Sequence, residues 1–128
     1  MEAIQQISIV GSLVNTNIKE VSLGSVTVTA GTTLNLTPVD VADSDQITLG
    51  LTPSTTHTHT GLFRFTSSDG VQAYTNSDKT PLISASSGNR ISDRQPVLGA
   101  KVVVRITNGD ASDRSYIVFV NKIGLKLS

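Results

Sequence analysis

Apolar and polar residues alternate along much of the sequence with a period of two. Val26, Val28, Leu34 and Leu36 alternate with Thr or Asn, and residues 46–51 continue the pattern. Successive side chains of a strand point to opposite faces of its sheet, so this period is typical of half-buried β-strands. Threonine and valine dominate these segments, and their β-branched side chains suit a pleated surface. We expect an all-β fold, an antiparallel β-sandwich or jelly roll of eight to ten short strands with little or no helix.

Turn-forming residues separate the periodic segments. Ala30-Gly31-Thr32 is typical of a tight turn, and Ser68-Asp69-Gly70 of a hairpin turn. The two clearest strands, residues 100–107 and 115–124, are joined by the loop Asn108–Arg114. We expect these last two strands to pair as a terminal hairpin.

The length of 128 residues indicates one domain. We expect residues 1–20 to form an N-terminal arm or a first strand, and residues 21–128 to form a single β-sandwich domain. Residues 76–99 contain two prolines, many serines and few periodic apolar residues, which favours a long loop. That loop either covers the chain's own surface or docks on a neighbouring subunit, with Arg90 and Arg94 as its contact residues.

Composition excludes several function classes. Ten basic and ten acidic residues give zero formal net charge, which argues against nucleic-acid and anionic-membrane partners. The chain has no cysteine, no apolar window of 18 residues and no secretion signal at its N-terminus, so we expect synthesis in the cytoplasm. Nucleophile-elbow, P-loop and dinucleotide-binding motifs do not occur, and the acidic residues lie in turn-like contexts. The sequence therefore predicts a protein that is not an enzyme and has no catalytic residues.

The last strand is apolar on both faces. Tyr116, Val118 and Val120 share one face, and Ile117 and Phe119 share the other. A sheet with one solvated face usually alternates apolar and polar residues. The second face is therefore covered either by the chain's own loops or by another subunit.

A second apolar run near the N-terminus contains Ile4, Ile7 and Ile9. It is either a core strand or an arm that crosses to another subunit. The predicted interface accordingly comprises Ile4, Ile7, Ile9, Ile117, Phe119, Arg90 and Arg94.

His57 and His59 are the only histidines, and they lie one residue apart in the segment TTHTHTG. On an extended strand they share a face, about 7 Å apart along the chain. Two imidazoles at this spacing do not make a closed metal site in one chain. They are either exposed polar residues of a strand or, where three chains meet at an axis, six nitrogens suited to octahedral iron or another transition metal. We expect no other cofactor.

The segment His57-Thr58-His59-Thr60-Gly61 resembles the H-x-H motif of tailed-phage fibres and spikes, in which three chains line up histidine pairs around an axial iron. From about residue 21 to residue 122, the chain is similar to small β-sandwich modules of phage virions, such as head-decoration (cement) proteins and head-fibre domains. The similarity rests on SVTVTAGTTLNL, FTSSDG and VVVRITNGDASDRSYIVFV. It implies a capsid decoration protein, a homotrimer that binds the viral major capsid protein on the outer surface of the virion and stabilises the head.

Two alternatives remain open. One is a receptor- or carbohydrate-binding module of a tail or fibre, for which the candidate aromatic residues are Tyr74, Tyr116, Phe63 and Phe65. The other is a self-assembling coat or tube subunit, which would form particles or tubes alone.

Overall fold

The computed structural model of the protein describes residues 18–69, 73–74, 81–86 and 88–124. These residues form eleven strands: β1 (Ile18–Val28), β2 (Thr33–Asn35), β3 (Val39–Asp40), β4 (Gln46–Pro53), β5 (His59–Thr66), β6 (Ala73–Tyr74), β7 (Ile83–Ala85), β8 (Arg90–Ile91), β9 (Gln95–Pro96), β10 (Lys101–Asn108) and β11 (Arg114–Ile123). Within these ranges, no helix is long and apolar enough to cross a membrane. The predicted all-β class is confirmed. The strands outnumber the eight to ten expected because four of them have only two residues, too few to leave a period in the sequence.

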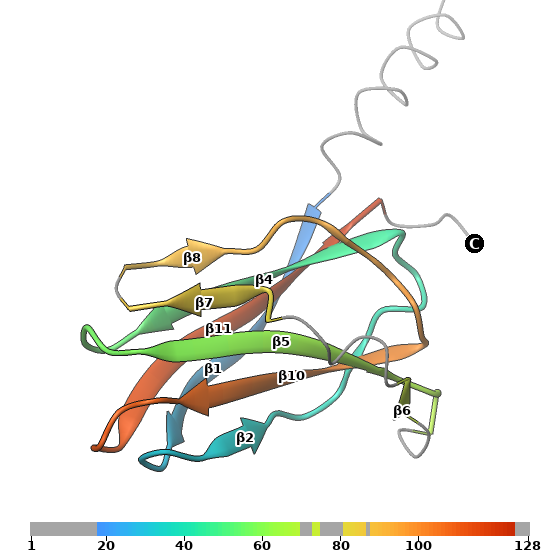
Figure 1. Ribbon diagram of the computed structural model, residues 1–128. Coiled ribbons are helices and arrows are strands. Elements are labelled where there is room, and N and C mark those ends of the chain that lie inside the picture. Colours follow the sequence, from blue (N-terminus) through green and yellow to red (C-terminus); the bar gives the residue numbers. More distant parts are fainter. Residues whose placement is uncertain (1–17, 70–72, 75–80, 87, 125–128) are drawn as a thin grey trace, which may run out of the picture.

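The strands form two antiparallel sheets that pack face to face (Figure 1). The β11 sheet has the order β1-β11-β4-β8, with β9 also paired to β4. The β10 sheet has the order β2-β10-β5-β6, with β3 paired to β10 and β7 paired to β5. The expected β-sandwich is therefore present, and β11 and β10 are central strands of its two layers.

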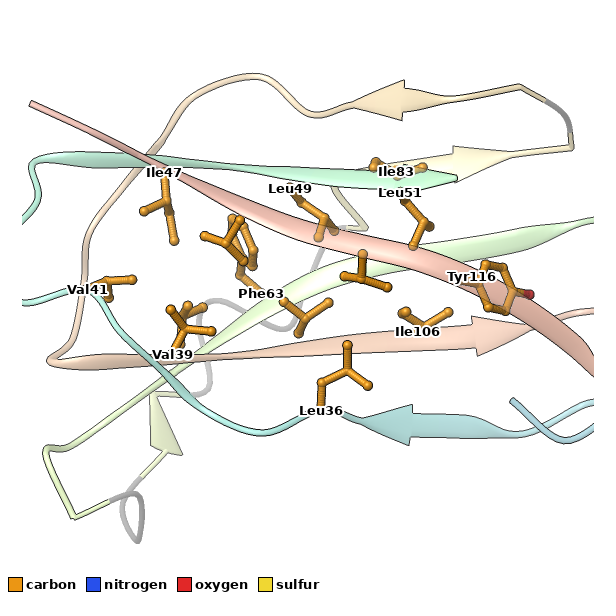
Figure 2. Packing of buried hydrophobic residues seen from close by; sticks show 14 of the residues in the cluster. Leu36, Val39, Val41, Ile47, Leu49, Leu51, Phe63, Ile83, Ile106 and Tyr116 are labelled. Atoms are coloured by element: carbon orange, nitrogen blue, oxygen red, sulfur yellow. The ribbon is translucent and has the colours of Figure 1, made fainter. Parts of the chain in front are cut away.

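The core lies between the two sheets and is built from the inward-facing residues of the long strands. Leu49 and Leu51 of β4 and Val118 of β11 face Phe63 of β5 and Val104 of β10, and all five are 2% exposed or less. Along β10, buried and half-buried residues alternate strictly, as expected for a strand with one face in the core. Figure 2 shows Leu49, Leu51 and Phe63 within one continuous cluster, with Tyr116 at one end.

The prediction that the last two strands pair as a hairpin is wrong. β10 and β11 follow each other in sequence but lie in different sheets, where β10 pairs with β5 and β11 pairs with β1 and β4. Residues 109–113 carry the chain from one layer to the other. A hairpin and a crossing between packed sheets give both strands the same alternating pattern, so periodicity alone does not distinguish them.

Two other predictions concern the ends and the long loop. β1 begins at Ile18, so Ile18–Glu20 belong to a strand, while residues 1–17 lie outside the described part of the chain. The stretch 81–99 contains β7, which pairs with β5, and β8 and β9, which pair with β4. It therefore passes from one sheet to the other along one side of the sandwich.

Candidate interaction surface

The outward side of the β11 sheet carries three neighbouring rows of side chains, which we call the outer β11 face. The register defines the rows as Ser22, Phe119, Gly50 and Ile91; Ser25, Ile117 and Thr52; and Glu20, Asn121 and Thr48. The hydrogen bond from Asn121 Nδ2 to Thr48 Oγ1, 3.2 Å long, joins two strands on this side. Glu20 is the single charged residue in these rows, so the face is apolar and hydroxyl-bearing.

Phe119 lies against Gly50 of the neighbouring strand. A Cβ atom added to Gly50 would overlap three ring atoms of Phe119, so the ring occupies the space that a side chain would fill. This contact leaves Phe119 half-buried and closes the gap over the glycine. The ring thereby forms part of a packed surface between strands β11 and β4.

Two exposed isoleucines flank Phe119. Ile117 is 54% exposed on β11, and Ile91 is 61% exposed on β8, where it pairs with Gly50. Beside Ile117 lies a hollow of about 220 Å³, lined by Ser25, Thr52 and Pro53 among others. Large apolar side chains that lie together on an outer sheet face indicate a surface for a partner.

The opposite outer face, on the β10 sheet, carries two arginines beside Leu62 and Val103. Arg64 and Arg105 alternate with core residues along β5 and β10, and Arg105 lies across from Asn35. The hydroxyls of Thr33 and Thr107 are 2.8 Å apart on the same face. The two faces of the sandwich therefore differ in charge, and the low-charge one carries the exposed isoleucines.

The structure brings together part of the predicted interface. Ile117 and Phe119 lie on the outer β11 face, and Arg90 is exposed on β8 next to Ile91. Arg94 is exposed in the segment between β8 and β9. Ile4, Ile7 and Ile9 lie outside the described residues.

Sequence reasoning missed Ile91 and Gly50. Ile91 stands alone among polar residues in a stretch expected to be a loop, and only its pairing with β4 brings it beside Phe119. Gly50 interrupts the apolar pattern of β4, which is a signal of close approach by another group in a strand.

His57 and His59 lie inside the sandwich. His57 is 7% exposed in the connection between β4 and β5, and His59, the first residue of β5, is 1% exposed. Both rings contact Tyr116 of β11, with centroids 5.4 and 5.5 Å from the tyrosine ring and 4.9 Å from each other. The expectation of exposed histidines is wrong. The rings face the chain's own interior, so the structure does not present them on an outer surface that three chains can share.

The hydrogen bonds of the three rings define their protonation. His57 Nδ1 lies 2.9 Å from the Thr55 carbonyl oxygen, and His59 Nδ1 lies 2.9 Å from the His57 carbonyl oxygen. Since a carbonyl oxygen only accepts, each Nδ1 donates its proton, and in the neutral imidazole with this tautomer Nε2 carries the lone pair. The Tyr116 hydroxyl donates to His57 Nε2 at 2.5 Å.

Burial shifts the titration of this cluster. Desolvation lowers the pKa of His59, against the opposing effect of its bond to the His57 carbonyl, and thereby keeps the imidazole neutral. Desolvation also raises the pKa of Tyr116 to about 12, with a further contribution from the nearby charge of Asp110. Burial therefore favours the neutral forms of the His59 imidazole and the Tyr116 phenol.

No known family model matches the sequence. No curated protein matches it either. Among solved structures, the PBSX exported protein XepA has a similar fold, with a TM-score of 0.62 at 9% identity over 86% of this chain and 38% of that one. A protein of Bacillus endospore appendages, from a family of disulfide-linked pili, aligns with a TM-score of 0.46 at 13% identity over 85% and 89% of the two chains. A T=1 particle derived from infectious bursal disease virus gives 0.47 at 12% identity over 84% and 31%.

The chain spans well under half the length of XepA. At 9% identity, the similarity between the two proteins is one of fold. It establishes that this two-sheet arrangement occurs in an exported protein, and it confirms the β-sandwich class expected from the alternating sequence.

Proposed function

We propose that this chain is a non-enzymatic structural protein of a virus particle, and specifically a decoration (cement) protein of a phage head. The observation that carries the proposal is the outer β11 face, where Ile91, Ile117 and Phe119 lie together with Glu20 as the one charged residue. An apolar face on a rigid sandwich is suited to protein contacts that are repeated by symmetry.

In this proposal the outer β11 face forms a homotrimer. Arg90, Arg94 and the segment that precedes β1 then bind the neighbouring major capsid protein subunits on the outside of the head. Each contact is modest, and the repetition of contacts around the trimer raises the overall affinity by avidity. The shell is stabilised because separating two capsid subunits requires breaking the contacts that link them.

One further observation supports an outer location. The net charge is zero, as suits a protein that is separated from the packaged nucleic acid by the shell.

The alternatives are less well supported. Of the four aromatic residues considered for carbohydrate binding, Phe63, Phe65 and Tyr116 are 2% exposed or less and belong to the core. The side chain of Tyr74 lies outside the part of the chain that the structure describes. For a coat or tube subunit, no observation favours assembly into a closed particle over binding to a preformed one.

The test compares two variants with equally exposed apolar residues. Ile117 and Leu98 are both 54% exposed, but Leu98 lies outside the three rows of the outer β11 face. Sedimentation velocity measures the oligomeric state, and co-sedimentation with DNA-emptied, expanded heads of the encoding phage measures binding. We expect a trimer that binds heads, a loss of at least tenfold in self-association for Ile117→Asp, and no change for Leu98→Asp.

A monomer at high concentration that also fails to bind heads would overturn the proposal. Particles or tubes formed by the purified protein alone would support the coat-subunit alternative instead.

A further inference from the structure

The two histidines and Tyr116 form a polar cluster that joins the two sheets at one end of the core. His59 belongs to the β10 sheet and Tyr116 to the β11 sheet, and the three ring centroids lie 4.9 to 5.5 Å apart. Figure 2 shows the Tyr116 hydroxyl directed away from the aliphatic side chain of Ile106. Buried polar groups at such a position require hydrogen-bond partners, and the aliphatic core around them offers none.

One atom of the cluster has no partner. His59 Nε2 is fully buried and makes no hydrogen bond to any residue of the described chain. Its Nδ1 proton is already donated to the His57 carbonyl, so Nε2 is a lone-pair acceptor in a dry environment. An unpaired buried acceptor loses the hydration that it has in the unfolded chain. A group bound at this atom would compensate for that lost hydration.

Both imidazoles are held in the way that metal-binding histidines usually are. Metal-ligating histidines donate their second ring N–H to a carbonyl or carboxylate, which fixes the tautomer and directs the other nitrogen to the ion. His57 and His59 each make this bond, to the carbonyl oxygens of Thr55 and His57, at 2.9 Å. In both histidines of one chain, therefore, the bond at Nδ1 fixes the ring and leaves Nε2 as the ligating nitrogen.

We propose that His57 Nε2, His59 Nε2 and Tyr116 Oη bind one first-row transition-metal ion, Cu²⁺ or Zn²⁺, inside each chain. The ion replaces the phenol proton that now lies between Tyr116 Oη and His57 Nε2, and this proton passes to solvent. The Oη to Nε2 distance then opens from 2.5 Å to about 3.3 Å, as two ligands at about 2.0–2.1 Å in a tetrahedral site require. Water takes the fourth position.

Imidazole and phenolate ligands suit both ions, and the general affinity order places Cu²⁺ above Zn²⁺. The ion reaches the site through the connection between β4 and β5, where Ser54, Thr55 and Thr56 are exposed and His57 is not fully buried. Because its ligands come from both sheets, the ion stabilises the folded state over the unfolded chain. The site is complete in one chain and does not depend on the proposed trimer.

The experiment uses the untagged full chain, freed of metal with a chelator and titrated with Cu²⁺ or Zn²⁺ salts alone. The chain has no cysteine and only these two histidines, so an imidazole signal arises from this site. We expect one ion per chain, a phenolate-to-copper charge-transfer band in the visible spectrum, and a rise in the thermal unfolding midpoint that EDTA reverses.

Tyr116→Phe retains the ring packing and removes the ligand oxygen, and we expect it to abolish the band and weaken binding at least tenfold. His59→Gln tests the second ligand, and Asp93→Asn, in an exposed segment, is the control for binding by surface carboxylates. Since a buried variant can fail to fold, ¹⁵N NMR of the wild-type histidines provides an independent measurement, in which both Nε2 resonances shift on adding Zn²⁺. Equal binding by wild type and Tyr116→Phe, or no stoichiometric binding of either ion, would overturn the proposal.

Discussion

At the scale of single residues, the outer β11 face depends on one close contact. Phe119 lies over Gly50 because no Cβ atom is present there, and the neighbouring Ile91 and Ile117 extend the apolar surface on both sides. A glycine in a strand lowers intrinsic strand stability, since it has no side chain to pack. The aromatic ring of the adjacent strand offsets that loss.

Gly50→Ala tests this contact. The added methyl group overlaps the ring of Phe119, so the ring must move outward, and we expect a loss of about 1–3 kcal/mol in the free energy of unfolding. Urea denaturation of Gly50→Ala, Phe119→Leu and the double variant measures it. The leucine of Phe119→Leu is smaller than phenylalanine and makes room for the methyl group of Gly50→Ala. The double variant should therefore lose less free energy of unfolding than the sum of the two single variants. Strict additivity would show that the residues do not compete for the same space.

The ring cluster predicts how stability depends on pH. His59 has a lowered pKa in the folded state, so below its ordinary pKa of 6.5 the unfolded chain binds a proton that the folded chain does not, and stability falls as pH falls. Tyr116 has a pKa raised from 10.0 to about 12, so the unfolded chain ionises first above pH 10. Stability there should fall by about 1.4 kcal/mol per pH unit up to pH 12. Denaturation of the metal-free protein across this pH range measures the free energy of unfolding. We expect Tyr116→Phe to remove the decrease in this free energy above pH 10. The same decrease in wild type and Tyr116→Phe would exclude Tyr116 as its source.

At the scale of elements, short connections cross between the sheets, and Asn108 holds two of them together. Its side chain is fully buried and donates to the carbonyl oxygens of Val28 and Ser112, at 3.0 and 2.9 Å, while its Oδ1 accepts from the Asp110 amide at 2.9 Å. One side chain thus joins the end of β1 to the connection between β10 and β11.

Asn108→Asp should destabilise the protein more than a surface substitution does. A carboxylate retains the acceptor for the Asp110 amide but donates nothing to the Val28 and Ser112 carbonyls, and it places a charge in a buried site. We expect a loss of about 2–4 kcal/mol in the free energy of unfolding. Thermal and chemical denaturation measure it, with the exposed Asn89→Asp as the matched control. Equal stability of the two variants would mean that water replaces the lost donors.

At the scale of the whole molecule, the sandwich presents two unlike outer faces. The β10 sheet carries Arg64 and Arg105 outward, whereas the outer β11 face carries exposed isoleucines and a single acidic residue. Contacts through an apolar face differ from ionic contacts in their response to salt, since screening weakens only the latter. The two faces can therefore be assigned to different partners by varying the ionic strength.

We expect self-association through the outer β11 face to be insensitive to sodium chloride and to strengthen in sulfate. Burial of apolar surface is not screened, and sulfate favours it by exclusion from the protein surface. Sedimentation equilibrium at about 50 and 500 mM sodium chloride measures this, with Arg64→Gln as the control for ionic contacts on the opposite face. A tenfold weakening at the higher salt would assign self-association to charged groups instead.

Much of the fold follows from local patterns. The alternation of Thr and Val predicts strands because β-branched residues suit a pleated sheet, and the two-faced pattern of β11 predicts correctly that Ile117 and Phe119 lie opposite the core. The turn at Gly31 is likewise present, with a positive φ of 66° and a bond from the Thr32 amide to the Thr29 carbonyl. Each of these features depends on residues near each other in the chain.

What tertiary structure alone decided is which strands pair and which faces are covered. A strand with one buried face has the same sequence whether its neighbour in the chain lies beside it or across the core, so β10 and β11 resembled a hairpin. The histidine segment alternates in the same way inside or outside a sandwich, and only the approach of Tyr116 from the other sheet buries it. The sequence determined the strands and their apolar faces through local stereochemistry. The sheet order, the position of Ile91 beside Phe119 and the buried ring cluster depend on contacts between distant residues, which no local period encodes.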